Sequence, residues 1–460
     1  MKNQIKTVVR RSGSLIAASS ISLCHSALPS WSQPSPEISN GNSTEAPLPI
    51  ISNNPTSTLN NFIGNPDWLD LNFSILSQNN GTPDANDRQI FTSSNLATLD
   101  LKIWLNHWMD DHNKNGFNIH AIGTQRAGEI LSFEIPNKLN TQWGFGNGPI
   151  GRLSLLALEY ENTESFISQF KIGKLKQSID FTMDGVMCYF SNFGMCGWAE
   201  GTPSMIDIPG NPFNTYGAMA RVGNPDNVSF KYGIYQIYPE SFETKYHGLD
   251  FRIDNNTGYA QFFQIDAKLP SQNLIPARQS ETGQIRRTNQ GENANVLYQS
   301  PLPPPVIKLG GWLGGGVYDR VDMLGETLNN NNGVYGLMSL PINPGKLAMD
   351  GRLFASGGFG LSEDVQSFRR GGNAGVVLAG VLPSRPFDTL ALGYTFADYN
   401  PSTPSIGFTA GTEHALELNY SINISPNFQL MPNMQLIMQP LGNEKASAVW
   451  VGGLQATLSF

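Results

Sequence analysis

The chain has 460 residues and a net charge of −8, only 14% of its residues are charged, and 47 are glycine. It lacks any apolar run long enough for a membrane-spanning helix, which needs about 20 residues, so a helical membrane protein is excluded. The acidic balance also excludes nucleic acid as the expected partner, because phosphate binding requires a basic face. A β-rich protein is the natural interpretation of this composition.

The first 33 residues have the features of an export signal. Basic residues between Lys2 and Arg11 precede a modest apolar core from Leu15 to Leu28, and prolines follow. We therefore expect residues 1–33 to be a signal peptide. Residues 34–60 are rich in Pro, Ser and Asn without any periodicity, so we expect a disordered leader there.

From residue 61 to the end, apolar and polar residues alternate in many short segments. Between Leu69 and Ile75, for example, Leu, Phe and Ile alternate with Asp, Asn and Ser. In a strand, such a pattern puts apolar side chains on one face and polar side chains on the other. Charges such as Asp100 and Lys102 on the polar face suggest an interior that contains water. Residues 61–460 are thus predicted to form an all-β, closed antiparallel transmembrane β-barrel of about 16 to 18 strands.

The alternation stops between Leu175 and Thr215. An irregular segment of this length is usually functional or disordered, and its aromatic residues argue for order. We interpret it as a loop that folds into the barrel and constricts it. It contains Cys188 and Cys196, for which a disulfide is expected in an oxidising compartment, because a metal site would need more Cys or His nearby.

Alternation resumes after this segment and continues to the C-terminus. Gly248–Asp254 is predicted to be a strand, and residues 270–305 are predicted to be an exposed loop. The last strand places Trp450 and Leu454 on the lipid face, and the chain ends on Phe460. A terminal aromatic resembles the signal by which outer-membrane barrels are delivered to the assembly machinery.

Several segments share the order and the character of a known family of channels. They are K-I-G-K-L-K-Q-S-I-D-F (171–181), M-C-Y-F-S-N-F-G-M-C-G (187–197), P-G-N-P-F-N-T-Y-G (209–217), Y-G-I-Y-Q-I-Y-P (232–239), E-H-A-L-E-L-N-Y (413–420) and Q-L-M-P-N-M-Q-L-I-M-Q-P (429–440). Together they resemble the carbohydrate-selective porins of the OprB type. The resemblance implies a 16-stranded barrel in outer-membrane lipid that passes sugars or other small hydrophilic solutes, as a monomer or a homotrimer. Cyanobacterial members often carry a surface-layer-homology module, which the leader does not resemble.

A porin selects its solutes with charged and aromatic side chains on the wet face of the wall. Arginines opposite carboxylates create a transverse field and hydrogen-bond hydroxyl groups, and aromatic rings can stack on sugars. On the expected wet face the candidates are Arg152, Arg221, Asp250, Arg252, Asp254, Arg352, Glu413 and Glu417, and in the inner loop they are Tyr189 and Trp198.

No catalytic motif is present in the sequence. The six histidines show no metal-binding spacing, and G-x-S-x-G does not occur. We therefore predict a channel for passive diffusion, not an enzyme, without a cofactor. Two alternatives stay open: an outer-membrane barrel hydrolase that uses His247 or His414 with a serine, and a soluble secreted β-sandwich that binds carbohydrate.

Overall fold

The fold was analysed in a computed structural model of the chain. The structure describes residues 50–51, 66, 68–83, 89–106, 115–131, 150–196, 213–237, 244–252, 258–270, 274–276, 297–323, 325–345, 347–402 and 411–460. The predicted signal peptide and most of the predicted leader lie outside these residues. Ile50–Ile51 of the leader forms β1, which pairs with β11 (Leu297–Gln299) beside β10 (Leu274–Pro276).

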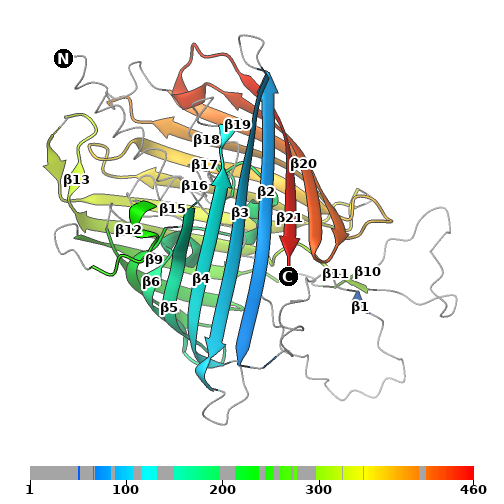
Figure 1. Cartoon of the computed structure of the whole chain (residues 1–460), viewed down its shortest axis with the longest axis horizontal. Helices are drawn as coiled ribbons and strands as arrows, with labels where there is room; N and C mark the ends of the chain where they lie inside the picture. Colours follow the sequence, from blue (N-terminus) through cyan, green and yellow to red (C-terminus); the bar gives the residue numbers. More distant parts are fainter. Residues whose placement is uncertain are drawn as a thin grey trace.

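Sixteen antiparallel strands form one closed barrel (Figure 1). They are β2 (Leu69–Pro83), β3 (Gln89–Trp104), β4 (Gly116–Gly128), β5 (Ile150–Glu161), β6 (Ile167–Leu175), β7 (Thr215–Gly223), β8 (Val228–Gln236), β9 (Gly258–Lys268), β12 (Val306–Gly316), β15 (Asn331–Ile342), β16 (Asp350–Gly360), β17 (Phe368–Ala379), β18 (Thr389–Tyr399), β19 (Thr412–Ser425), β20 (Phe428–Met438) and β21 (Val449–Ser459). The predicted fold class is confirmed, and the β-sandwich alternative is ruled out.

The first and last barrel strands close the ring. β21 pairs with β2 along eight residue pairs, from Ser74↔Ser459 to Gly81↔Gly452. The terminal residue continues this pairing, since Phe460 N donates to Phe73 O at 2.8 Å and Phe73 N donates to Phe460 O at 3.1 Å. Their rings stack with centroids 6.3 Å apart. Phe460 is therefore the last residue of the β2–β21 pairing that closes the barrel.

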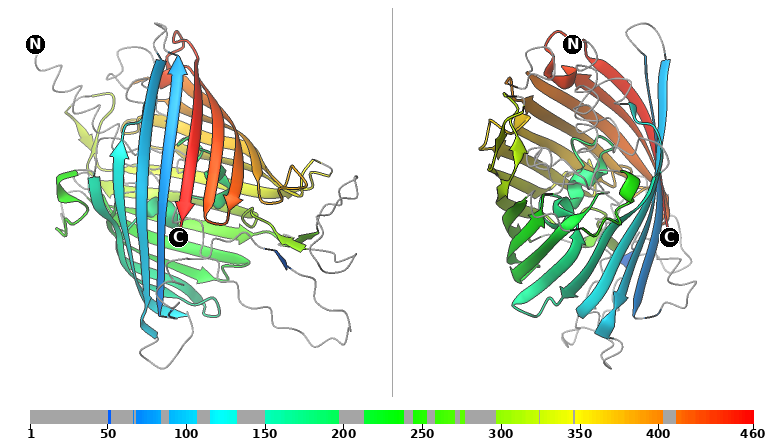
Figure 2. Two further views of the ribbon diagram at one scale, coloured as in Figure 1. Left: turned by 45° about the vertical axis from the view of Figure 1, so that its right-hand side comes forward. Right: turned by 60° about the vertical axis from the view of Figure 1, so that its left-hand side comes forward.

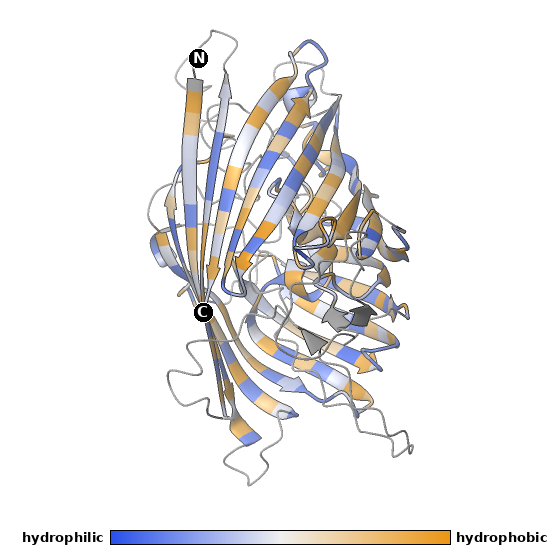
Figure 3. Ribbon diagram, turned by 90° about the vertical axis from the view of Figure 1, so that its right-hand side faces the viewer, coloured by the Kyte–Doolittle hydropathy of each residue, from blue (hydrophilic) through white to orange (hydrophobic). Residues whose placement is uncertain are grey.

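Side chains are distributed in the opposite way to those of a water-soluble protein. On β19, Glu413 and Glu417 are fully buried at 0% exposure, whereas Leu416 and Leu418 are 36% and 43% exposed. Figure 3 shows this alternation of hydrophilic and hydrophobic residues along the strands. An apolar outer surface around a polar interior is the pattern of a barrel whose outside faces lipid.

The two rims of the barrel differ. Short turns such as 162–166 and 224–227 connect strands at the rim where the chain enters β2 and leaves β21. The opposite rim carries the long connection 176–214 between β6 and β7, and the rim of short turns carries one long segment, 269–305, between β9 and β12. Helical segments in the described residues are limited to α3 (Gln177–Asp180), η3 (Gly185–Tyr189), η5 (Thr244–Tyr246) and η7 (Pro440–Gly442), and none of them is long and apolar enough to cross a membrane.

The predicted strand at Gly248–Asp254 is wrong over the residues that the structure describes. Gly248 has a φ of +72°, a left-handed value that interrupts an extended chain. The preceding residue binds the wall, since His247 O accepts from Leu153 N at 2.9 Å. The segment therefore lies against β5 where β5 and β6 are not paired, since their pairing covers only 156–161 of β5. One side of this segment faces β5 and the other side does not, so apolar and polar residues alternate along it as they would in a strand. The alternation alone therefore cannot distinguish the two structures.

One glycine allows tight packing in the wall, and its replacement tests the fold. A Cβ at Gly333 would come within 2.0 Å of the fully buried Trp312 ring. We expect Gly333→Ala to destabilise the barrel by about 2 kcal/mol, because the ring cannot move without overpacking its surroundings. Gly123→Ala is the matched control, since a Cβ there meets nothing within 4 Å. The temperature at which folded protein loses its heat-modifiable gel mobility should fall for Gly333→Ala alone.

Candidate channel constriction

The chain leaves the barrel wall after β6 and returns to it at β7. Within the described part of this segment, α3 and η3 lie inside the barrel (Figure 2). β19 is half-way around the ring of sixteen strands from β7. Contacts between the segment and β19 therefore cross the interior. We call residues 176–196 the inner loop.

The far end of the inner loop is held by a buried carboxylate. Glu417 of β19 accepts hydrogen bonds from Ser191 N at 2.8 Å and Asn192 N at 2.7 Å. Asn192 Nδ2 also donates to Gln435 Oε1 of β20 at 2.9 Å. These four residues form what we call the Glu417 clamp. A carboxylate that accepts two backbone N–H groups in a buried site makes strong, charge-assisted hydrogen bonds.

The near end of the inner loop is held by Asp180 at the end of α3. Its carboxylate pairs with Lys171 Nζ at 3.1 Å and accepts from Tyr235 OH at 2.9 Å. Its backbone carbonyl accepts from Lys231 Nζ at 2.6 Å. Lys171 lies on β6, and Lys231 and Tyr235 lie on β8. The inner loop is thus fixed to opposite walls.

A third contact braces the inner loop from the short-turn rim. Tyr189 OH donates to Pro301 O in the segment that precedes β12. Lys308 Nζ pairs with Asp184 at 3.3 Å, and Leu302 belongs to the same apolar cluster as Phe190. The inner loop therefore has partners on three sides.

Positive charge is concentrated on one side of the barrel. Strands β18–β21 and β2 contain no Lys or Arg, and Glu413 and Glu417 are buried on this side. In the ring order, these strands lie opposite β6–β9 and β12. The inward-facing cations of β4–β9 and β12 include Arg126, Arg152, Lys171, Arg221, Lys231 and Lys308. Such an arrangement gives a field across the interior.

The predicted arginines of the wall have different surroundings. Arg152 is buried on β5 with its guanidinium 4.2 Å from the Phe213 ring centroid. Arg221 on β7 is partly exposed, 4.0 Å from Asp266. Arg352 on β16 is buried and donates from Nε to Pro303 O at 3.0 Å, so it anchors the segment before β12.

The predicted acidic residues serve as structural partners in this fold. Glu413 accepts from Tyr399 OH at 3.1 Å and from Leu441 N at 2.6 Å, which fixes the turn before β21. Asp250 forms a bidentate pair with Arg252, with oxygen–nitrogen distances of 2.9 and 2.7 Å, in the segment outside β5. Glu417 binds the inner loop that contains Tyr189, and Arg352 holds the segment that Tyr189 contacts, whereas the Asp250–Arg252 pair lies outside β5. Asp254 and Trp198 lie outside the described residues.

The inward-facing residues of β4 were not among the candidates that the sequence analysis named. Phe117 and Ile119 face outward on β4, and Asn118 and Arg126 face inward. The same period-two alternation that identified the other strands was available there. The role of Asp180 had no comparable local signal, since its partners come from distant strands.

The histidines of the hydrolase alternative make no catalytic arrangement in the described residues. His247 Nδ1 lies 2.7 Å from Gly151 O, and His414 Nδ1 lies 2.6 Å from Tyr394 OH. Neither contact involves a serine, so these contacts give no support to a nucleophilic site.

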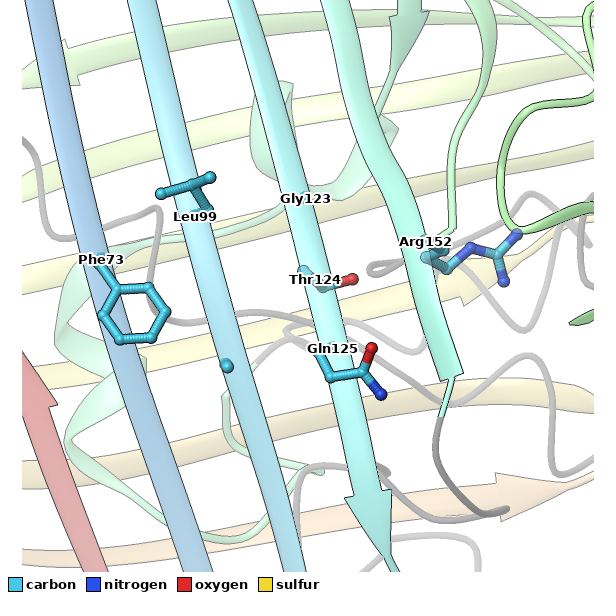
Figure 4. A pocket seen from close by; sticks show the side chains of 7 residues that line it. Phe73, Leu99, Gly123, Thr124, Gln125 and Arg152 are labelled. Atoms are coloured by element: carbon cyan, nitrogen blue, oxygen red, sulfur yellow. The ribbon is translucent and has the colours of Figure 1, made fainter.

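A hollow of about 290 Å³ is present in the wall at β2–β5 (Figure 4). Most of its lining residues, such as Leu99 and Gln125, are at outward-facing positions. Gly123 creates part of the space, because it has no side chain there. This hollow belongs to the outer surface and not to the channel interior.

A closed barrel with an apolar outside, a polar inside and an inner loop defines a porin-type outer-membrane protein. The family model described as "Carbohydrate-selective porin, OprB family" matches residues 108–460. The chain therefore belongs to the OprB family of carbohydrate-selective porins. The barrel extends beyond the matched residues, since β2 and β3 precede them.

Individual relatives agree with this assignment. The chain is 25% identical over 342 residues to "Putative porin QuiX" of Acinetobacter baylyi. The alignment covers 70% of this chain and 72% of that protein. A high-pH structure of Pseudomonas putida OprB has a TM-score of 0.72 at 16% identity and covers 88% of this chain and 96% of that one. A low-pH structure of the same protein has a TM-score of 0.50 at 13% identity and covers 88% of this chain and 95% of that one. The structures support the fold.

Removing the carboxylate of the Glu417 clamp should release the inner loop. Glu417→Ala leaves two buried backbone N–H groups without an acceptor, at a cost of about 3 kcal/mol. We expect single-channel conductance in planar bilayers to become larger and noisier. Glu363→Ala, at an exposed carboxylate between β16 and β17, is the control and should leave the current unchanged. A folded Glu417→Ala barrel with wild-type current would show that the clamp does not hold the loop in place.

We propose that Cys188 and Cys196 form a disulfide in the inner loop. Their Sγ atoms are 2.6 Å apart, and the structure describes no free cysteine. Alkylation of unfolded, unreduced protein should therefore leave both residues unmodified, and both should react after reduction. Mass spectrometry of the peptide that contains them provides the measurement. Alkylation before reduction would contradict the proposal.

Proposed function

We propose that the protein lets sugars and other small hydrophilic solutes diffuse passively across the outer membrane. The observation that carries this proposal is the inner loop, which is fixed to opposite walls of a barrel with a polar interior. A loop in this position limits the size of what can pass. Transport then requires no covalent step and no energy source, because the solute moves down its own gradient.

Weak binding at several places would set the preference among solutes. The cation-bearing wall offers Lys and Arg donors to hydroxyl groups, and the opposite wall carries carboxylate and amide side chains in place of cations. Binding must stay weak for rapid release. The family description supports carbohydrate as the solute class. The name of the relative QuiX supports the channel class.

Export and assembly follow the same proposal. Residues 1–33 would direct the chain across the inner membrane and be removed. The barrel-assembly machinery would recognise β21 with Phe460, the outward side chains of the barrel would contact lipid, and copies could associate as a homotrimer. Deleting Phe460 should slow insertion without changing the current of those barrels that do assemble.

Liposome swelling tests the proposed transport directly. Purified protein in liposomes should admit pentoses and hexoses quickly and larger oligosaccharides slowly, because the inner loop restricts the passage. The swelling rate for sugars of graded size is the measurement, with protein-free liposomes as the control. Folded, heat-modifiable protein that admits none of these sugars and gives no channels in planar bilayers would contradict the proposal.

A further inference from the structure

Two buried arginines share one aromatic ring beside the inner loop. The guanidinium carbons of Arg152 and Arg126 lie 4.2 and 5.7 Å from the ring centroid of Phe213. Arg126 of β4 pairs with Ile150 of β5, and Arg152 is two residues further along β5. The two side chains are therefore diagonal neighbours on the inward face. In Figure 4 the Arg152 side chain extends away from β4, past the edge of β5.

Arg126 has no anionic partner in the part of the chain that the structure describes. Its residue exposure is 1%, and its Nε and Nη1 atoms have no hydrogen-bond partner. The strand neighbours of Arg126 are Leu96 and Ile150, which are apolar. By contrast, Arg221, Arg252, Arg320, Arg352, Arg369, Arg370 and Arg385 each have a carboxylate within ion-pair distance.

A buried cation without a counter-charge is unfavourable, and a second guanidinium nearby adds repulsion. A bound anion would remove both penalties at once. The planar guanidinium matches a carboxylate especially well, since two N–H groups can meet its two oxygens. Phe213 lies two residues before β7, where the chain rejoins the barrel wall. Arg126 and Arg152 therefore lie at the end of the connection 176–214 that leads into β7.

Hydroxyl groups continue the same inward face. Thr124 Oγ1 and Ser154 Oγ lie 2.7 Å apart and are buried on β4 and β5, each two residues from one of the arginines. Together these groups could hold a carboxylate at the arginines and hydroxyls next to it. Either hydroxyl can donate or accept, so both suit a hydroxylated carbon chain.

We propose that Arg126 and Arg152 form a binding site for the carboxylate of a polyhydroxylated acid, such as a sugar acid. The site rests on the proposed channel function and extends its solute class from neutral sugars to their acids. The carboxylate neutralises the charge of Arg126, and Thr124 and Ser154 contact the hydroxyl groups of the solute. A neutral sugar would leave Arg126 without its counter-charge.

Permeation of matched solutes tests the site. Gluconate should enter wild-type liposomes faster than glucose, and Arg126→Gln should reduce the gluconate rate about five- to tenfold, a far larger change than in the glucose rate. Arg126→Lys keeps the charge and should retain most of the gluconate preference. Arg320→Gln is the matched control, because Arg320 pairs with Asp322 in the connection between β12 and β15, away from the arginine pair.

Binding can be measured without transport. Gluconate should raise the unfolding temperature of the detergent-solubilised wild-type barrel and not that of Arg126→Gln. Acetate, which lacks hydroxyls, should stabilise it less, and an equal or larger effect of glucose 6-phosphate would replace carboxylate by phosphate as the preferred anion and overturn the proposal. Equal gluconate and glucose rates in a wild-type channel, with no gluconate-dependent stabilisation, would overturn the site while the channel function stands. A wild-type barrel without any permeation would instead refute the proposed function.

Discussion

Pairing of β21 with β2 is the interaction on which the rest of the structure depends. In lipid, an open sheet would leave the N–H and C=O groups of two edge strands without partners, and each such group is costly. The β2–β21 pairs and the reciprocal bonds between Phe73 and Phe460 remove both edges. Only a closed ring can then present leucines outward and glutamates inward, as β19 does.

The same closure creates the problem that the inner loop solves. A ring of sixteen strands encloses more space than its side chains fill, and the chain that leaves the wall after β6 occupies part of it. Polar backbone groups of that loop need partners inside the barrel. Glu417 on one side and Lys231 on the other supply them. The constriction is therefore stabilised by the polar interior that the wall already requires.

Charge in the interior is balanced almost everywhere by nearby opposite charge. Lys171, for example, lies between Asp180 and Glu159, at 3.1 and 3.4 Å. Arg126 departs from this rule among the described arginines. A position in which an otherwise consistent principle fails is where function is most expected, and this distinguishes the arginine pair from the cations that stabilise the wall.

The sequence by itself determined the barrel, because the two-residue alternation of a strand is a local property that each segment carries. It also placed Glu413 and Glu417 on the inward face and the chain end on the closing strand. The alternation did not separate Gly248–Asp254 from a true strand. The partners of Glu417 were decided only by the tertiary structure, because Ser191 lies 226 residues away in the chain and the two meet across the closed ring. The same holds for Arg126, because which of the described residues lie beside its guanidinium depends on what folding brings there.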